Sequence, residues 1–394
     1  MNAIKLFCKA ALAALAAAVI AKSVAQEFAY PHNLHDISLR VNEIHAMHEG
    51  LNPFHVWDGS VQSEKYRPAP TVGYKPGDDD GDPRAPVAYY PPWHALLTWW
   101  YGSLSPQDAG TLLNFANGLA LAALALFFLR FPLFRGDCGF ADAALAWLVF
   151  SAFLAAEFTW NSLTGNYGAF AMGCTVLLAY ALEKDGDLLA AAAFTLLSVK
   201  PQIAALFGWP LLFGRKWKPL FAAGVFAAAG TLFVAWRLDE SPVALIQQIF
   251  DVGKPFLEHT DKLHIFRLGE LATRLFGPLG ANLATISCFA ACGILSFLLR
   301  NEREWWLKML PPAIFFPFWT YSWPYDTLAA WPLILAMTLM AFGQEPFRFK
   351  SKSLRLCAST VLAIALFELA LVRFRHSAHI SYRLVFPLFG FAAL

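Results

Sequence analysis

Long apolar stretches separated by short polar connectors run through this chain. Residues 4–25, 109–129, 219–236 and 277–299 are predominantly apolar. Stretches of about 17 to 25 apolar residues match the length at which a helix crosses a hydrocarbon core of about 30 Å. Transmembrane β-strands would instead give shorter segments of alternating polarity. The pattern therefore predicts an all-α polytopic membrane protein.

Other apolar stretches are shorter or interrupted. Further candidate segments are residues 138–156, 167–182, 309–320, 327–343, 354–372 and 384–394. Residues 187–213 are interrupted by Lys200 and Pro201, and each half is too short to cross comfortably. Because broken helices at membrane depth occur only where they line a protein cavity, we predict a re-entrant or broken helix here. The whole chain then forms a bundle of about 10 to 12 membrane segments.

The apolar pattern divides the chain into three parts. Residues 1–25 form a first transmembrane anchor, although Ser-Val-Ala at 23–25 also fits a signal-peptidase site. Residues 26–106 form a hydrophilic loop with amphipathic helices, and residues 107–394 form a multi-span domain.

Basic connectors predict the orientation of these parts. Residues 215–218, 300–308 and 347–355 are rich in Lys and Arg, which the positive-inside rule assigns to the cytoplasmic side. Residues 26–106 and 237–266 are then expected on the outer face.

Composition agrees with lipid as the main solvent. The chain is 58% hydrophobic and only 15% charged, with a mean hydropathy of +0.47. Soluble domains are about 25% charged. The net charge of +2, with no long run of Lys and Arg, excludes a nucleic-acid partner.

The loop after the first span begins with a predicted helix over residues 35–49, ended by Gly50. Its apolar stripe contains Ile37, Val41 and Ile44. Another face carries three charged side chains, which are Asp36, Arg40 and Glu43. One interpretation is an exposed helix stabilised by an Asp36–Arg40 pair four residues apart. The other is a reactive face close to the membrane surface.

Two further segments are amphipathic and too short to span. Tyr90, Pro91, Pro92 and Trp93 precede the aromatic residues 94–101. This segment is either an anchor at the headgroup level or a platform beside a substrate groove.

The second amphipathic segment starts at Ser241 and Pro242, a typical helix start. Its single apolar face predicts an interfacial helix. That face contains Val243, Ile246, Ile249 and Phe250.

Lys200 is the most informative charged residue. An ammonium group inside a long apolar stretch is costly and by default marks a functional site. A polar turn at residues 321–326 is a further intrusion facing outward. The loop histidines (His32, His35, His45, His48 and His55) and the nearby aspartates (Asp78, Asp79, Asp80 and Asp82) have no diagnostic metal spacing.

Several short motifs occur in order along the chain. They are Asp36 after the first span, Gly50-Leu51-Asn52-Pro53-Phe54, Tyr90-Pro91-Pro92, Gly165-Asn166-Tyr167, Lys200-Pro201-Gln202 and Asp326 in a polar turn. Together they resemble glycosyltransferase family 87, whose members have the GT-C membrane fold and use polyprenyl-phosphate sugars. Two departures from the family pattern are the shortened Gly165-Asn166 and the segment Ser322-Trp323-Pro324-Tyr325-Asp326, which lacks the paired His of the mannosyltransferase branch. The resemblance therefore does not specify mannose.

The resemblance implies roles for individual residues. Asp36 is expected to be the general base, with Glu43 and Asp326 as its rivals. Substrate binding is expected from Arg40, Tyr90, Asn166, Lys200, Gln202, His264, Arg267 and Asp326. Lys200 is expected at the donor phosphate, and Arg237 is a further candidate there. No cofactor is implied, and a divalent metal stays an open possibility.

The chemistry explains why such an enzyme needs these residue types. Nucleotide sugars are not available outside the cytoplasmic membrane, so the donor must be lipid-linked. A phosphate leaves as an anion and needs cations, whereas a glycosidase needs a carboxylic acid to protonate its leaving group. One carboxylate base and positioned positive charge are then sufficient.

We therefore predict inverting transfer of a sugar from polyprenyl phosphate to a lipid or glycan acceptor at the outer face of a bacterial inner membrane. The alternatives are a transporter or flippase of a lipid-linked glycan and a non-catalytic envelope-assembly protein.

Overall fold

A computed structural model of the 394-residue chain describes residues 3–29, 34–57, 59–66, 90–128, 140–259, 277, 279–319, 324–342 and 366. Within these ranges the regular secondary structure is helical throughout and contains no strand. The all-α prediction is therefore confirmed.

Five helices in the described part of the chain are long and apolar enough to span a membrane. They are α1 (Ala3–Ala29), α5 (Pro106–Phe128), α6 (Phe140–Thr164), α10 (Trp217–Leu238) and α13 (Leu279–Leu298). They contain 20 to 27 residues, enough for lengths of about 30 to 40 Å. The chain is a polytopic membrane protein, as the hydropathy pattern predicted.

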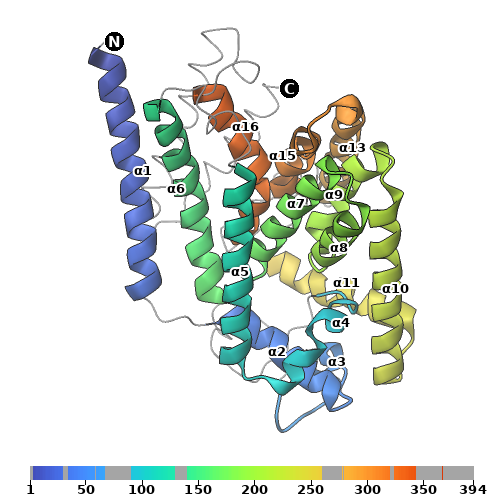
Figure 1. Cartoon of the computed structure of the whole chain (residues 1–394). Helices are drawn as coiled ribbons and strands as arrows, with labels where there is room; N and C mark the ends of the chain where they lie inside the picture. The colour runs from blue at the N-terminus through green and yellow to red at the C-terminus, as the bar shows by residue number, and fades with distance from the viewer. Residues whose placement is uncertain are drawn as a thin grey trace.

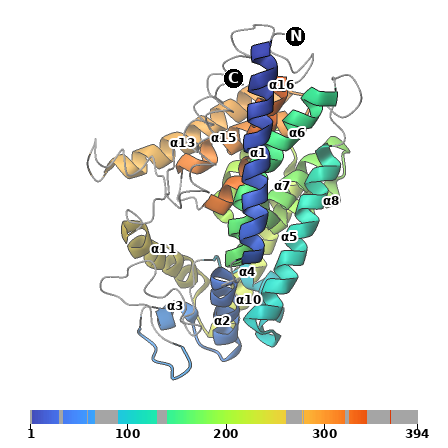
Figure 2. The ribbon, with the colours of Figure 1, turned by 90° about the vertical axis from the view of Figure 1, so that its left-hand side faces the viewer.

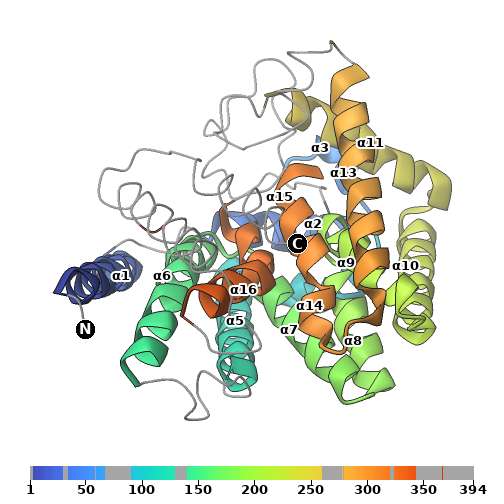
Figure 3. The ribbon, with the colours of Figure 1, turned by 90° about the horizontal axis from the view of Figure 1, so that it is seen from above.

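Shorter helices fill the space between the long ones. α7 (Gly168–Glu183) packs against α5 and against α8 (Asp187–Leu197), and α8 in turn packs against α10. α1 lies along α6 at one edge of the bundle, far from α10 (Figures 1 and 3). The central helices are therefore shielded by the long ones.

The first short hairpin consists of α8 and α9 (Pro201–Phe213). Its helices have 11 and 13 residues, too few to cross a bilayer. α9 starts at Pro201 because proline suits the first helical position, where its missing N–H costs nothing. At the base of the hairpin, Lys216 pairs with Asp185 at 3.0 Å and Lys218 with Asp187 at 2.6 Å. The chain therefore returns to the side from which it entered, which confirms the predicted re-entrant segment.

A second short hairpin lies beside the first. α15 (Leu310–Trp319) leads to the 3₁₀ helix η5 (Pro324–Ala330) and then to α16 (Trp331–Phe342). α14 (Trp305–Lys308) contacts both α15 and α16, so their outer ends lie together. α15 also packs against α9. The tips of the two hairpins therefore meet inside the bundle.

One end of the bundle carries the short helices of the first loop together with α11. α2 (His35–His48), α3 (Pro53–Trp57), α4 (His94–Thr98), the 3₁₀ helix η1 (Trp99–Ser103) and α11 (Pro242–His259) lie there (Figures 1 and 2). We call it the α2 end. The opposite end, which we call the basic end, contains the connectors with Lys184, Arg215, Lys216, Lys218, Arg300, Arg303 and Lys308.

α6 is longer than its apolar pattern suggested. The sequence predicted a span over residues 138–156, but the helix continues to Thr164. Asn161 is buried, and its Oδ1 accepts a hydrogen bond from the backbone N–H of Ala169 at 2.9 Å. Because this polar side chain finds its partner inside the bundle, it does not end the helix.

Candidate active site

α2 is held against the turn that joins α6 to α7. The backbone N–H of Leu34 donates to the carbonyl oxygen of Leu163 at 3.1 Å. Gly165 has a φ of 72°, in the left-handed region that favours glycine. A Cβ on Gly165 would lie 2.8 Å from Cγ2 of Ile37, so glycine permits the close approach. This docking brings the first turn of α2 next to Asn166.

The apolar stripe of α2 faces the protein rather than water. Ile37, Val41 and Ile44 are fully buried in a cluster with Phe54 and Val234. The interpretation of α2 as an exposed helix is therefore wrong. Burial of the stripe positions the charged face of the helix toward the hairpin tips.

A chain of polar side chains runs from α2 to both hairpin tips. Nδ2 of Asn166 donates to Oδ2 of Asp36 at 2.7 Å, and Oδ1 of Asn166 accepts from Nζ of Lys200 at 2.7 Å. Lys200 also forms an ion pair with Asp326 in η5. The backbone N–H of Gly168 donates to the same Asn166 oxygen at 3.1 Å, which helps to fix the orientation of the amide. Four residues predicted separately from the sequence are thus in direct contact.

Burial differs between the polar side chains of this hydrogen-bonded series. Lys200 is 3% exposed and Asp326 is 1% exposed, whereas Asp36 is only partly buried. An isolated charge at such a depth would be expensive, so each of the two buried groups depends on the other. In the described part of the chain, the Asn166 bond is the only hydrogen bond found for the Asp36 side chain. The carboxylate therefore has lone pairs left to accept further hydrogen bonds.

Arg40 and Glu43 form a second buried pair on the same face of α2. Nη1 of Arg40 donates to Oε2 of Glu43 at 2.6 Å, and both side chains are under 5% exposed. The predicted Asp36–Arg40 pair is therefore replaced by an Arg40–Glu43 pair. The reason is that Asp36 is turned toward Asn166 by the docking of α2.

The Arg40 guanidinium lies against a cluster of aromatic rings. Arg40 lies over the ring of Tyr90, with 4.6 Å from Cζ to the ring centroid. His94 and Tyr167 contact Tyr90 at centroid distances of 4.8 and 5.5 Å. Burial lowers the pKa of His94 well below its ordinary 6.5, and the positive charge of Arg40 adds to this effect. A neutral imidazole therefore stands beside the cation at neutral pH.

Burial also raises the pKa of Glu43 from 4.5 to about 7, against the opposing effect of Arg40. As the pH rises above 4.5, the unfolded chain loses this proton first, so the free energy of unfolding falls until about pH 7. The difference corresponds to at most about 3 kcal/mol, at about 1.4 kcal/mol per pH unit. We expect Glu43→Gln, which cannot ionise, to remove this part of the pH dependence. Thermal unfolding from about pH 5 to 8 in one detergent tests this prediction.

The slope with pH is the relevant quantity in that experiment. Glu43→Gln also removes the counter-charge of Arg40 where Glu43 is ionised, above about pH 7, and lowers stability there. If the variant and the wild type show the same slope between about pH 5 and 7, the raised pKa of Glu43 is wrong.

The remaining predicted site residues are not part of the hydrogen-bonded series from Asp36 to Asp326. Gln202 is half-buried in the first turn of α9. Arg237 donates to the carbonyl oxygen of His48, which ties α10 to the end of α2. His264 and Arg267 lie outside the described residues. In the part of the chain that the structure describes, no group of three His, Cys, Asp or Glu side chains is placed to hold a metal ion.

In the structure, His94 and Asn52 make contacts that their sequence context did not indicate. His94 was predicted only as the start of an aromatic segment, and Asn52 only as part of a motif. Oδ1 of Asn52 accepts from the N–H of Phe54 at 2.9 Å, as at many helix starts. The available signal was a polar residue directly before a proline-initiated helix.

These features define a polytopic membrane protein with a buried polar chain where two re-entrant hairpins meet an extramembrane helix. The chain belongs to glycosyltransferase family 87, whose family model matches residues 88–310, and it is therefore a membrane glycosyltransferase. The matched region contains Tyr90, Asn166 and Lys200, whereas Asp36 and Asp326 lie outside it. No match was found among curated proteins or among solved structures.

Proposed function

We propose that this glycosyltransferase moves one sugar from a polyprenyl-phosphate donor to an acceptor hydroxyl at the outer face of the cytoplasmic membrane, with inversion. The observation that carries the proposal is the Asp36 carboxylate, which is held by Asn166 and partly accessible. In this role Asp36 removes the proton of the acceptor hydroxyl as the oxygen attacks the anomeric carbon. The polyprenyl phosphate leaves from the opposite side.

A phosphate fits this site as the leaving group better than a sugar or an alcohol. A departing phosphate needs no proton, and one carboxylate base is then sufficient for a single displacement, which inverts the anomeric centre. Positive charge at the phosphate would supply the other main catalytic effect. Lys200 and Arg40 are the proposed cations among the described residues, and His264 and Arg267 remain candidates from the sequence.

Both described cations already have carboxylate partners. Lys200 is paired with Asp326 and Arg40 with Glu43. A phosphate at either cation would share it with that carboxylate. We therefore propose a second role for Lys200, which is to hold Asn166 and, through it, to orient Asp36.

The orientation of the bundle supports an outward-facing site. Basic side chains gather at the basic end, and the positive-inside rule assigns such an end to the cytoplasm. The α2 end, with Asp36, then faces outward. A lipid-linked sugar suits this face because nucleotide sugars are confined to the cytoplasm.

The orientation can be measured with one substitution and one matched control. Trp217 is 59% exposed between Lys216 and Lys218, and Ser103 is exposed in η1 at the α2 end. In a background without the six native cysteines, an impermeant thiol reagent should label Ser103→Cys in intact cells. Trp217→Cys should react only after the membrane is permeabilised. The reverse pattern would contradict the proposed orientation.

A reconstituted assay tests the reaction itself. The purified protein in lipid nanodiscs is given a panel of synthetic polyprenyl-phosphate sugars and the matching nucleotide sugars, with a panel of lipid and glycan acceptors. We expect transfer from one polyprenyl-phosphate sugar and none from nucleotide sugars, with the product anomer opposite to the donor by NMR. Transfer from a nucleotide sugar, or retention of configuration, contradicts the proposal. In a parallel assay with sealed proteoliposomes, movement of a lipid-linked glycan across the membrane without transfer would favour a flippase.

A further inference from the structure

α11 connects the end of α10 to residues beyond the described range, and it divides into three sectors around its circumference. Leu245 is fully buried, and Ile249 packs against the cluster that holds α2. Val243 and Phe250, two turns apart on the helix, are 74% and 72% exposed. Asp251 is exposed about 80° to 100° around the helix from these two residues, and the exposed Gln247 lies between them and Asp251. The helix thus has a protein-facing, an apolar outward and a polar outward sector.

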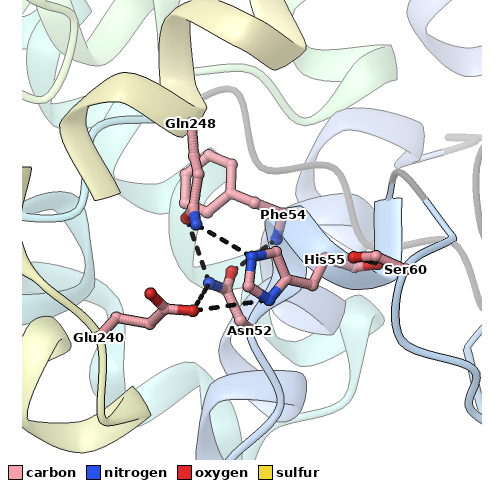
Figure 4. A network of polar contacts seen from close by, with 6 residues as sticks. All are labelled: Asn52, Phe54, His55, Ser60, Glu240 and Gln248. Atoms are coloured by element: carbon pink, nitrogen blue, oxygen red, sulfur yellow. Dashed lines mark hydrogen bonds and ion pairs between the residues drawn. The ribbon is translucent and has the colours of Figure 1, made fainter. Parts of the chain in front are cut away.

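The protein-facing sector is attached to the first loop by a polar cluster (Figure 4). Nδ2 of Asn52 lies 3.1 Å from Oε1 of Gln248 in α11 and 3.2 Å from Oε1 of Glu240 before it. Nε2 of Gln248 is 3.0 Å from Nε2 of His55, whose Nδ1 lies 3.5 Å from the same Glu240 oxygen. The cluster fixes the rotation of α11 about its own axis. Val243 and Phe250 are consequently held outward.

The apolar outward sector of α11 follows, along the chain, a stripe of exposed apolar residues on α10. Phe221, Val225, Leu232 and Trp236 project from this span and are 51% to 78% exposed. Asp239 adopts a left-handed conformation that ends α10, and α11 starts soon after it at Pro242. Tryptophan near the end of a span is typical of the headgroup level. The chain therefore passes from α10 to α11 near the level where the bilayer meets water.

The direction of α11 agrees with such a position. Figures 1 and 2 show it running across the bundle, near the level at which α1 ends. A helix in that direction cannot span, but it can lie in the interface with apolar side chains toward the acyl chains and polar ones toward water.

We infer that α11 is seated in the interfacial layer of the bilayer, with phospholipid covering Val243 and Phe250. The sequence predicted one apolar face that included Ile249, whereas the structure uses Ile249 inside the protein. The polar cluster around Asn52 then connects a helix that contacts lipid to the loop that follows α2. This inference concerns the contact with lipid and does not depend on the proposed reaction.

Photo-crosslinking in the otherwise native chain tests the inference. The photoreactive amino acid p-benzoylphenylalanine replaces Val243, Phe250, Gln247 or Asp251, one at a time, in protein reconstituted with a tagged phosphatidylethanolamine. Trp236, on the lipid-facing stripe of α10, is the positive control. We expect positions 243 and 250 to capture the tagged lipid several-fold more than position 251 and about as well as position 236, with intermediate capture at position 247, which lies between the two sectors.

Two outcomes overturn the inference. Equal, low capture at all four α11 positions would mean that the helix lies in water. Capture of a second copy of the chain at positions 243 and 250, in place of lipid, would mean that this sector is a protein interface. Elution of each variant as a single symmetric species confirms that low capture is not a result of misfolding.

Discussion

Asp36→Asn is expected to lower turnover by about a hundredfold to ten-thousandfold while the protein stays folded. The substitution preserves size, and Asn166 can still donate to the remaining side-chain oxygen at position 36. It removes the negative charge that would accept the acceptor's proton. Transfer from the active polyprenyl-phosphate sugar by purified, reconstituted protein measures the effect, and thermal unfolding checks the fold.

Glu43→Gln and Asp326→Asn are the matched controls, because both remove a buried carboxylate near the same site. Each should disturb stability more than chemistry, since each carboxylate has a cationic partner of its own. If Asp36→Asn keeps more than about a tenth of wild-type turnover while one control is inactive, the general base is that other residue. Full transfer activity of Asp36→Asn and of both controls would show that none of these three carboxylates is the general base.

Lys200→Met is expected to lower the free energy of unfolding by about 3 to 5 kcal/mol, because it leaves the Asp326 carboxylate buried without its ammonium partner. Joint replacement by Lys200→Met and Asp326→Leu should recover most of that stability, since an apolar pair of similar volume tolerates burial. Denaturation of the two single variants and the double variant in one detergent gives the coupling energy directly.

The double variant also separates the two roles proposed for Lys200. If Lys200 binds the donor phosphate, the stable double variant should bind donor about ten- to a hundredfold more weakly, the loss expected for a charge-assisted hydrogen bond. If Lys200 only positions Asn166 and Asp36, donor KM should stay near the wild-type value and kcat alone should fall. Recovery of both stability and transfer would leave Lys200 with a structural role only.

The turn at Gly165 shows how local and distant effects combine at this site. Its left-handed backbone is a local property, and glycine is the residue that adopts it most readily. Its consequence is distant, because the missing Cβ lets Ile37 approach and places Asn166 against Asp36, 130 residues earlier in the chain. The motif was visible in the sequence, but its partner was not.

The sequence by itself showed that lipid is the main solvent, and it gave the α2 helix, the break at Lys200 and Pro201, and the positions of the long spans except the end of α6. These features depend on local properties, which are hydrophobic periodicity over one or two turns and the missing N–H of proline. The resemblance to glycosyltransferase family 87 likewise rests on short motifs, each contained within a few consecutive residues.

Only the tertiary structure decided which charges are partners. Lys200 pairs with Asp326, 126 residues away, and Arg40 pairs with Glu43 although Asp36 is close along the same helix. Similarly, Ile249 and Phe250 share a predicted apolar stripe, but one faces protein and the other faces outward. Helical periodicity specifies which residues share a face, whereas the partner of that face depends on how distant helices dock, because docking buries or exposes the same side chains.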